Sequence, residues 1–174
     1  TIPRYTQFTS SVAGVSYTFR TISTHTATDD GTGDYEFVTA EGSTSIPVYQ
    51  GTERTKTFFV GDVTDRQLYV IPDDTIDTAT IQTQVFESPT SSAFTTYTLL
   101  DNATSVDAES RYYSIHEAPN GFYEIHFSDG ITFGIAPVSG NKIVINYLST
   151  VGAAANGGST FNPVSQVTVN AVNY

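Results

Sequence analysis

The sequence predicts a mainly β fold, an antiparallel sandwich or meander, which is expected to divide into two packed β subdomains. Eleven runs are rich in Thr, Val, Ile, Tyr and Phe and end at Gly, Pro, Asp or Asn, as strands do. No segment keeps the period of an amphipathic helix, and only 102–110 is expected to hold a helical turn. The predicted strands are 17–21, 35–39, 45–49, 55–60, 67–71, 80–87, 95–100, 112–117, 122–127, 142–148 and 164–172.

A hairpin is the clearest predicted unit. Pro119 pre-sets φ for a turn, and Asn120-Gly121 supplies the positive-φ positions that close a short loop between two strands. Strict alternation then divides the side chains of 122–127 and 142–148 between two faces. If these strands pair, the expected core is Tyr123, Ile125 and Phe127 beside Ile143, Ile145 and Tyr147.

The opposite face of these two strands is predicted to be half apolar. Phe122 on the first strand and Val144 and Leu148 on the second lie away from the expected core. An exposed apolar face of this kind is typical of contact with another subunit. These three residues are therefore the candidate interface.

Two segments are expected along the chain. Residues 1–51 hold weaker strands around an acidic loop, whereas residues 52–174 hold the stronger strands and the hairpin. The chain has no Met and begins at Thr1, so it is expected to be a fragment of a longer protein.

Composition argues against several classes of function. Seven basic residues stand against 18 acidic ones, which gives a formal net charge of -11, and no Lys/Arg cluster occurs. Tracking of a phosphate backbone or of an anionic membrane needs clustered cations, so nucleic-acid and membrane partners are not expected. No Cys is present, which excludes disulfides and thiolate metal sites.

Metal sites find little support in the sequence. Asp29, Asp30 and Asp34 could offer oxygen ligands to calcium, but position 40 is Ala where a calcium loop needs a terminal acidic ligand, and Glu41 comes one residue late. His116 and His126 flank the hairpin turn and are expected to approach each other across the strands, whereas His25 lies far away in the sequence. No metal and no other cofactor is therefore predicted.

The sequence patterns of catalytic sites are also incomplete in this chain. Glu124-Ile-His-Phe-Ser-Asp129 is similar to the carboxylate-bearing strand of β-sandwich glycosidases, but alternation sends Asp129 into a turn and away from Glu124. No Gly-x-Ser-x-Gly nucleophile elbow occurs. No enzymatic function and no catalytic residue are predicted.

Glycines and asparagines punctuate the region from 120 to 157 in a specific order. A strand ends in an aromatic residue, Asp-Gly and a further Gly, followed by Gly-Asn, a Val/Ile/Tyr strand and a small-residue segment that closes in Asn-Gly. This order resembles the baseplate wedge proteins of T4-like contractile-tailed phages, in the baseplate J-like family; Ser128 stands where the family usually has Gly. The runs 46–51 and 71–81 also resemble that family. The matching residues are Phe127, Asp129, Gly130, Gly134, Gly140, Asn141, Tyr147, Leu148, Asn156 and Gly157.

The resemblance implies a structural component of a virion. Such a protein would join copies of itself and other baseplate wedge proteins into a ring around the tail tube, after assembly in the host cytoplasm. The alternative is a glycan-binding β-sandwich module of a phage fibre or an adhesin, in which the many Tyr and Thr residues form the binding platform.

Overall fold

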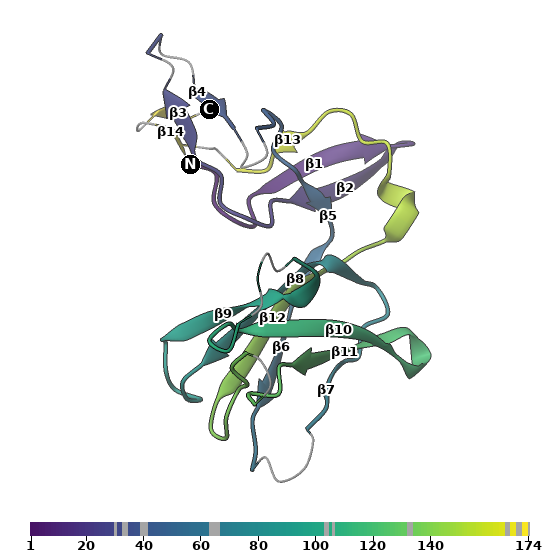
Figure 1. Cartoon of the computed structure of the whole chain (residues 1–174). Helices are drawn as coiled ribbons and strands as arrows, with labels where there is room; N and C mark the ends of the chain where they lie inside the picture. Colours follow the sequence, from purple (N-terminus) through teal and green to yellow (C-terminus); the bar gives the residue numbers. More distant parts are fainter. Residues whose placement is uncertain are drawn as a thin grey trace. The chain divides into compact units, whose positions relative to one another are not determined.

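The computed structural model confirms the mainly β prediction, with 49% of the residues in strands and 6% in short helical turns. It describes residues 1–29, 31–32, 35–38, 42–62, 67–102, 105, 107–131, 134–165, 168–169 and 172–173. The chain forms two compact units (Figure 1). Unit 1 comprises Thr1–Thr52 and Thr150–Tyr174, and unit 2 comprises Glu53–Ser149.

The last 25 or so residues belong to unit 1, whereas the sequence pattern grouped them with the central strands. The reason is that a strand near the start of the chain pairs with one near its end. Strand β13 (Asn162–Pro163) pairs antiparallel with β1 (Gln7–Val12), with Phe8 opposite Pro163. A pairing between such distant segments leaves no local signal in the sequence.

Unit 1 is built on a sheet with the order β13-β1-β2-β5, where β2 is Val15–Arg20 and β5 is Tyr49–Gln50. A tight turn at Ala13 (φ 50°) and Gly14 (φ 82°) connects β1 to β2. Two small hairpins join β3 (Ala27–Asp29) to β4 (Tyr35–Phe37) and β14 (Thr168–Val169) to β15 (Val172–Asn173). A helical turn, η3 (Gly152–Ala155), precedes β13.

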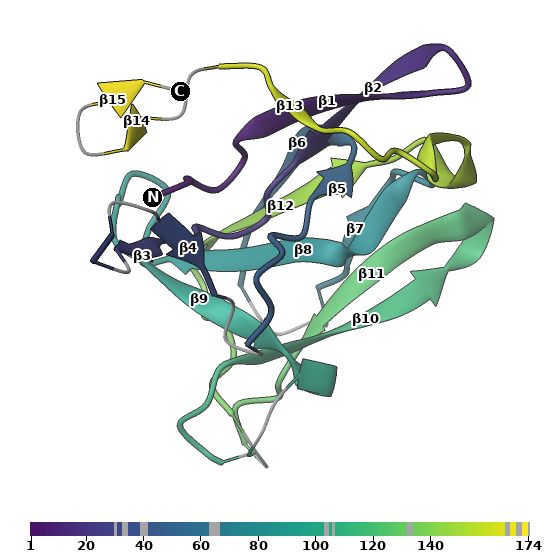
Figure 2. The same ribbon diagram turned by 90° about the horizontal axis from the view of Figure 1, so that it is seen from above.

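Unit 2 is a seven-stranded sheet with the order β6-β12-β8-β9-β10-β11-β7 (Figure 2). Every described register in it is antiparallel except that of β9 and β10, which pair in parallel. Two helical turns, η1 (Leu100–Asn102) and η2 (Pro119–Gly121), flank β10. The strands are β6 (Thr52–Phe59), β7 (Tyr69–Ile71), β8 (Ile76–Phe86), β9 (Phe94–Leu99), β10 (Tyr112–Ala118), β11 (Phe122–Phe127) and β12 (Lys142–Ser149).

The sheet of unit 2 curls until its two edge strands approach each other and it nearly closes. The rings of Phe58 on β6 and Tyr69 on β7 meet edge to face with centroids 5.4 Å apart. The Gln67 side-chain amide donates to the Phe59 carbonyl oxygen at 2.8 Å. The curled sheet encloses one core of buried side chains: Val60, Tyr69, Ile71, Ile76, Ile81, Val85, Tyr97, Tyr113, Ile125, Ile143, Ile145 and Tyr147.

The predicted core residues enter this core, but not through direct pairing of their strands. Ile125, Ile143, Ile145 and Tyr147 are buried, and Tyr123 and Phe127 pack against them half-buried. Strand β11 pairs with β10 and β7, whereas β12 lies between β6 and β8. The two faces meet across the interior of the curled sheet, because closure brings together strands that are not neighbours.

Several predicted elements were wrong in extent. Only Tyr49 of the run 45–49 is in a strand, and the run 164–172 holds short separate strands in place of one long strand. The described residues of 102–110 contain no helical turn beyond Asn102, where η1 ends. Strand β1 escaped prediction because its Ser and Thr residues and its Ala-Gly turn give a weak hairpin signal.

Candidate functional site

The turns of the Gly/Asn motif adopt the backbone that their glycines predict. Gly121, Gly130, Gly134, Gly140, Gly152 and Gly157 all have positive φ, between 65° and 98°. At the hairpin tip Asn120 also has a positive φ of 71°, so that η2 reverses the chain and Ala118 lies opposite Phe122. The predicted hairpin between β10 and β11 is confirmed.

Gly134 is required for a close approach as well as for its backbone conformation. A Cβ atom at this position would lie 2.8 Å from the Ser128 Oγ and 2.9 Å from the Ser110 carbonyl oxygen. The next residue reinforces this contact, since the Ile135 amide donates to the same Ser110 oxygen at 2.8 Å. The motif therefore anchors the loop after β11 directly against the segment before β10.

Asn141 holds the other end of this loop. Its Oδ1 accepts the Val138 amide at 2.8 Å, and its Nδ2 donates to the Glu87 carbonyl oxygen at 3.2 Å. Its own carbonyl oxygen accepts the Val60 amide at 2.9 Å. One side chain thus closes a turn and fastens it to the end of β8, which explains an Asn rather than an Asp at this position, because only the amide both donates and accepts.

Asp129 also has a backbone role. Its Oδ1 accepts the Ile131 amide at 2.9 Å, a local turn in which a side chain replaces a backbone acceptor. Gly130 follows with φ 70°, and a Cβ atom there would lie 3.3 Å from the Ala136 Cβ. The Asp-Gly pair is therefore a structural turn, as predicted.

The motif ends in unit 1, not in unit 2. Asn156 follows η3, and its amide donates to the Ala153 carbonyl oxygen at 3.1 Å. Gly157 comes next with φ 98°. The motif residues therefore divide between the two units, with Asn120 to Asn141 in unit 2 and Asn156-Gly157 in unit 1.

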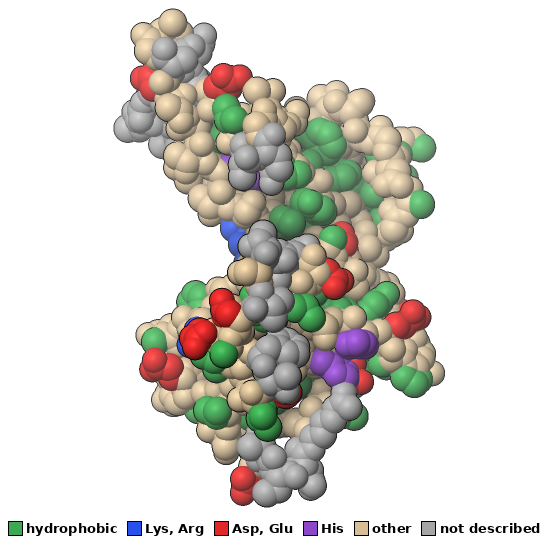
Figure 3. All heavy atoms as spheres, in the orientation of Figure 1, with side chains coloured by type: hydrophobic (Ala, Val, Ile, Leu, Met, Phe, Trp, Pro, Cys, Tyr) green, Lys and Arg blue, Asp and Glu red, His purple; other side chains and the backbone are tan. Residues whose placement is uncertain are grey.

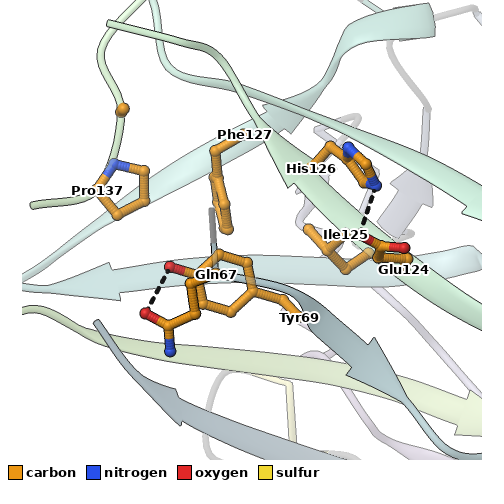
Figure 4. Close-up of a pocket in the computed structure, with 8 residues that line it drawn as sticks. Gln67, Tyr69, Glu124, Ile125, His126, Phe127 and Pro137 are labelled. Carbon is orange, nitrogen blue, oxygen red and sulfur yellow. Dashed lines mark hydrogen bonds and ion pairs between the residues drawn. The ribbon is translucent and has the colours of Figure 1, made fainter. Parts of the chain in front are cut away.

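A hollow of about 160 Å³ lies beside the end of β11 (Figure 4). Tyr69, Phe127, Pro137 and Gln67 gather on one side of it, and the Tyr69 hydroxyl lies 3.5 Å from the Gln67 Oε1. Burial raises the pKa of Tyr69 above its ordinary value, so this hydroxyl stays neutral and can donate. The hollow therefore combines aromatic faces with a few polar groups.

Histidines mark the outer face of the hairpin. The His126 Nε2 lies 2.8 Å from the Glu124 Oε1, and the Ser114 Oγ lies 3.0 Å from the His116 Nε2. The rings of His116 and His126 are 4.5 Å apart between centroids, which confirms the predicted approach across the strands. Figure 3 shows the pair as a purple patch on unit 2. Among the described residues no three His, Asp or Glu side chains converge as metal ligands.

A polar cluster forms in the run 71–81, which also contributed to the resemblance. The Asp73 Oδ1 accepts the Thr75 amide at 2.9 Å and the Thr75 hydroxyl at 2.6 Å. Partial burial works to raise the pKa of Asp73, but these bonds, one from Tyr147 and the charge of Arg54 outweigh it and lower that pKa. Burial, together with the negative charge of Asp73 and the hydrogen bond to it, raises the pKa of Tyr147 to about 12.

The candidate interface needs correction at Leu148. Its side chain is fully buried, because a register shift between Asn146 and Leu148 breaks the alternation of β12 and buries two successive residues. Phe122 and Val144 are half-buried, but β11 and β12 are not neighbours, so the three residues form no single patch. A buried side chain cannot contact a partner directly.

The acidic loop is described only in part. The Asp29 Oδ1 accepts the Gly31 amide at 2.8 Å, which is an ordinary side-chain turn. Asp30 and Asp34 lie outside the described residues. His25 belongs to unit 1, where its backbone pairs with Ile2, whereas His116 and His126 belong to unit 2.

Sequence reasoning missed the exposed apolar residues of the loop between β11 and β12. Ile131 is 91% exposed and Val138 is 60% exposed, although both are large hydrophobic side chains. The signal was present in Ile135-Ala136-Pro137-Val138, an apolar run that its proline prevents from continuing a strand.

A comparison with protein-family models gives no match to this chain, and a comparison with curated proteins gives none either.

Proposed function

We propose that this chain is part of a structural protein of a contractile-tail baseplate, where it mediates contacts between subunits of the wedge. The observation that carries the proposal is the Gly/Asn motif from Asn120 to Gly157, whose order resembles that of baseplate wedge proteins. Its residues make turns and backbone anchors, and none of those described above is positioned for catalysis. Residues of this kind fix the conformation of the backbone, which is expected of a protein with a structural role.

The proposed role includes no catalytic step. Glu124 pairs with His126, and Asp129 accepts a backbone amide in its own turn. A glycosidase needs two carboxylates that face each other across a scissile bond, one as acid and one as nucleophile. Glu124 lies on β11 beside His126, whereas Asp129 lies in the turn that follows the strand, and this placement supports a structural role.

The proposed partners are copies of the chain and other wedge proteins, and the proposed location is the tail baseplate of a virion after assembly in the host cytoplasm. No nucleic-acid or membrane partner is proposed, because the formal charge is -11. Among the described residues no helix has the length and hydropathy to cross a membrane.

A second candidate function is glycan binding. The hollow beside β11 favours it, because Tyr69 and Phe127 present aromatic rings next to the polar groups of Gln67 and Glu124. Aromatic faces and a few convergent polar groups are typical of small-ligand sites. A volume of about 160 Å³ is small for such a site, so assembly remains the primary proposal.

Sedimentation velocity distinguishes the two functions. The chain would be studied alone over a range of concentrations, and then mixed with the purified remaining proteins of a contractile-tail wedge. Assembly predicts a faster boundary that contains this chain together with itself or with a wedge protein. A chain that sediments as a monomer in every mixture, but binds a glycan in a glycan-array experiment, would replace the proposal with the second candidate.

A further inference from the structure

Asparagine directly precedes glycine at two places in the chain, Asn120-Gly121 and Asn156-Gly157. Such a pair is chemically unstable, because the backbone nitrogen of the glycine can attack the Asn side chain and glycine has no Cβ atom to hinder the approach. All four residues are exposed. The sequence alone does not distinguish the two pairs, whereas the fold does.

The first pair is held by the hairpin on both sides. Asn120 and Gly121 lie in η2 at the tip, and Ala118 pairs with Phe122 immediately outside them. Asn120 has φ 71° and ψ 20°, so the Gly121 nitrogen lies near the Asn120 backbone nitrogen and away from its side chain. Because the peptide bond is planar, this nitrogen can reach the side-chain face only by rotation of ψ. That rotation would separate Ala118 from Phe122.

The second pair has no such restraint. Asn156 has φ -72° and ψ 143°, an extended conformation from which less rotation of ψ brings the Gly157 nitrogen to the side-chain carbon. The Gly157 amide and the Asn156 side chain make no hydrogen bond to any residue that the structure describes. A Cβ atom added at Gly157 would meet no described atom within 4 Å. The reacting atoms therefore have open space around them.

Asparagines outside these pairs are restrained where their side chains are described. Both polar atoms of the Asn141 side chain are hydrogen-bonded. Asn146 lies inside β12, and its Oδ1 accepts the Thr55 hydroxyl at 2.8 Å. Asn162 precedes Pro163, whose nitrogen has no proton to lose.

We infer that Asn156-Gly157 is a site of spontaneous deamidation. The Gly157 nitrogen loses its proton and attacks the Asn156 Cγ; a C–N bond forms, and the side-chain nitrogen takes up a proton and leaves as ammonia. The resulting five-membered succinimide ring then consumes one water. Opening at one carbonyl gives Asp, and opening at the other gives isoaspartate. The reaction needs only water, with no enzyme, metal or oxidant.

The isoaspartyl product changes the length of the main chain. Its backbone runs through the Cβ and Cγ atoms of residue 156, which adds one carbon between Ala155 and Gly157. Residues on both sides are fixed in place: Ala155 is buried, and a Cβ atom at Gly158 would lie 2.8 Å from the Ser10 Oγ. The extra carbon therefore has to displace one of these two attachments.

The segment after Gly158 holds β13 against β1 (Figure 1). The ring of Phe161 meets that of Phe19 edge to face with centroids 5.0 Å apart. The Val164 amide donates to the Gln7 carbonyl oxygen at 2.9 Å. We therefore expect isoaspartate at position 156 to loosen this edge of the sheet, whereas Asp at the same position adds only a charge.

Incubation of the full chain at mildly alkaline pH tests the site. Chymotrypsin, which cleaves after aromatic residues and Leu, releases peptides 114–122 and 149–161, and each contains one Asn. Mass spectrometry of these peptides measures conversion of Asn120 and Asn156 separately. In the folded chain Asn156 should convert about tenfold or more faster than Asn120. Both rates should become similar in guanidinium, because unfolding removes the restraint of the hairpin.

Variants separate the reaction from its consequence. Asn156→Gln keeps a carboxamide but requires a larger ring, so ammonia release from the folded chain should fall about tenfold or more. Asn120→Gln is the matched control and should leave conversion of Asn156 unchanged. Freshly purified Asn156→Asp carries the charge without the extra carbon. Hydrogen exchange of the Val164 amide should be faster in the aged wild-type chain than in Asn156→Asp, and exchange in β8 should be the same in both.

Contrary results would overturn defined parts of the inference. If Asn156 did not convert in the folded chain, or converted no faster than Asn120, the site would be wrong. If the two rates differed as much in guanidinium, neighbouring residues in the sequence and not the fold would set them. If Asn156 converted but Val164 exchanged equally in the aged chain and in Asn156→Asp, only the effect on β13 would be wrong. The reaction involves no partner, so none of these results bears on the proposed function.

Discussion

The two compact units differ in how many apolar side chains they bury among the described residues. Unit 2 encloses one cluster of twelve buried residues inside a curled sheet. In unit 1 the buried side chains among the described residues are few: Ile2, Phe19 and Ala155, with the polar Ser10 and Thr21; unit 2 also buries the polar Thr80, Thr83 and Ser128. Thr21 lies in a network of bonds, since its hydroxyl donates to the Pro3 carbonyl oxygen at 2.8 Å and its carbonyl oxygen accepts the Tyr5 amide at 2.9 Å.

This difference indicates which interactions stabilise each unit. Burial of apolar surface stabilises unit 2, because each fully buried Ile contributes about 1.5 to 3 kcal/mol. Unit 1 depends more on pairing between distant segments, above all β1 with β13 and Gln50 with Thr150. We therefore expect unit 1 to open first and unit 2 to supply the rigid surface for assembly.

The largest expected effect is in the core of unit 2. Ile145 is fully buried, so Ile145→Ala should lower the free energy of unfolding of this unit by about 3 to 5 kcal/mol through lost burial and a cavity. Urea unfolding followed by tyrosine fluorescence measures the change. Ile2→Ala in unit 1 is the comparison, and it should cost less because fewer buried neighbours surround it. Equal losses of unfolding free energy in Ile145→Ala and Ile2→Ala would contradict the proposed difference between the two units.

Gly134 offers the next largest effect. Gly134→Ala brings a Cβ atom within 2.9 Å of the Ser110 carbonyl oxygen in a positive-φ conformation, and we expect it to cost about 2 to 4 kcal/mol. Gly140→Ala is the matched control, since its φ is 89° but no atom lies within 4 Å of the added carbon. It should cost about 1 to 2 kcal/mol. Thermal unfolding that gave the same loss for both would show that close packing at Gly134 is unimportant.

Gly130 allows the turn that follows β11 to be tested separately from the core of unit 2. Gly130→Val places a β-branched residue at φ 70° and should lower stability by about 1 to 3 kcal/mol. Asp129→Ala at the neighbouring position removes one turn hydrogen bond and should cost about 1 kcal/mol. An unchanged melting temperature in Gly130→Val would contradict the structural assignment of this turn.

Gln50 tests whether unit 1 can open by itself. Its Oε1 accepts the Thr150 hydroxyl at 2.8 Å and the Val151 amide at 2.9 Å, so Gln50→Ala should destabilise unit 1 by about 1 to 2 kcal/mol. Hydrogen exchange should then speed up for amides of β1 and β2 and stay unchanged for β8 and β12. Exposed Gln7 provides the control variant, Gln7→Ala. Faster exchange throughout both units would mean that they unfold as one.

The smallest expected effect concerns pH and Tyr147. Tyr147→Phe removes the hydrogen bond to Asp73 and should cost about 1 kcal/mol at neutral pH. Because folding raises the pKa of Tyr147 to about 12, its contribution is complete below pH 10 and is lost as the pH rises toward 12. The difference in free energy of unfolding between the wild-type chain and the Tyr147→Phe variant should therefore become smaller between pH 10 and pH 12. Asp73 has a lowered pKa, so its contribution should instead disappear at acid pH.

Local patterns predicted the strongest elements of unit 2. Strand β11 begins and ends where its alternation indicates, at Phe122 and Phe127, and the Asn120-Gly121 turn directly precedes it. The glycine positions could be predicted because positive φ restricts the choice of residue so strongly. The role of Asn141 could not be predicted, since two of its partners, Val60 and Glu87, lie just after strands that are distant in the sequence.

The remaining errors arose because the sequence does not show which strands pair with each other. Nothing local in the sequence shows that β12 lies between β6 and β8, or that β13 joins β1. Leu148 was assigned to the outer face because alternation was assumed, and the register shift after Asn146 reverses that assignment. The exposed residues Ile131 and Val138 were missed because apolar residues in a loop have no periodicity that would mark them.

Cryo-electron microscopy of a contractile-tail baseplate assembled in the presence of this chain tests whether the chain is a baseplate component. If the proposed function is right, the seven-stranded sheet of unit 2 should fit density in the baseplate. Absence of this chain from the baseplate, or its presence at the tip of a fibre, would contradict the proposed function.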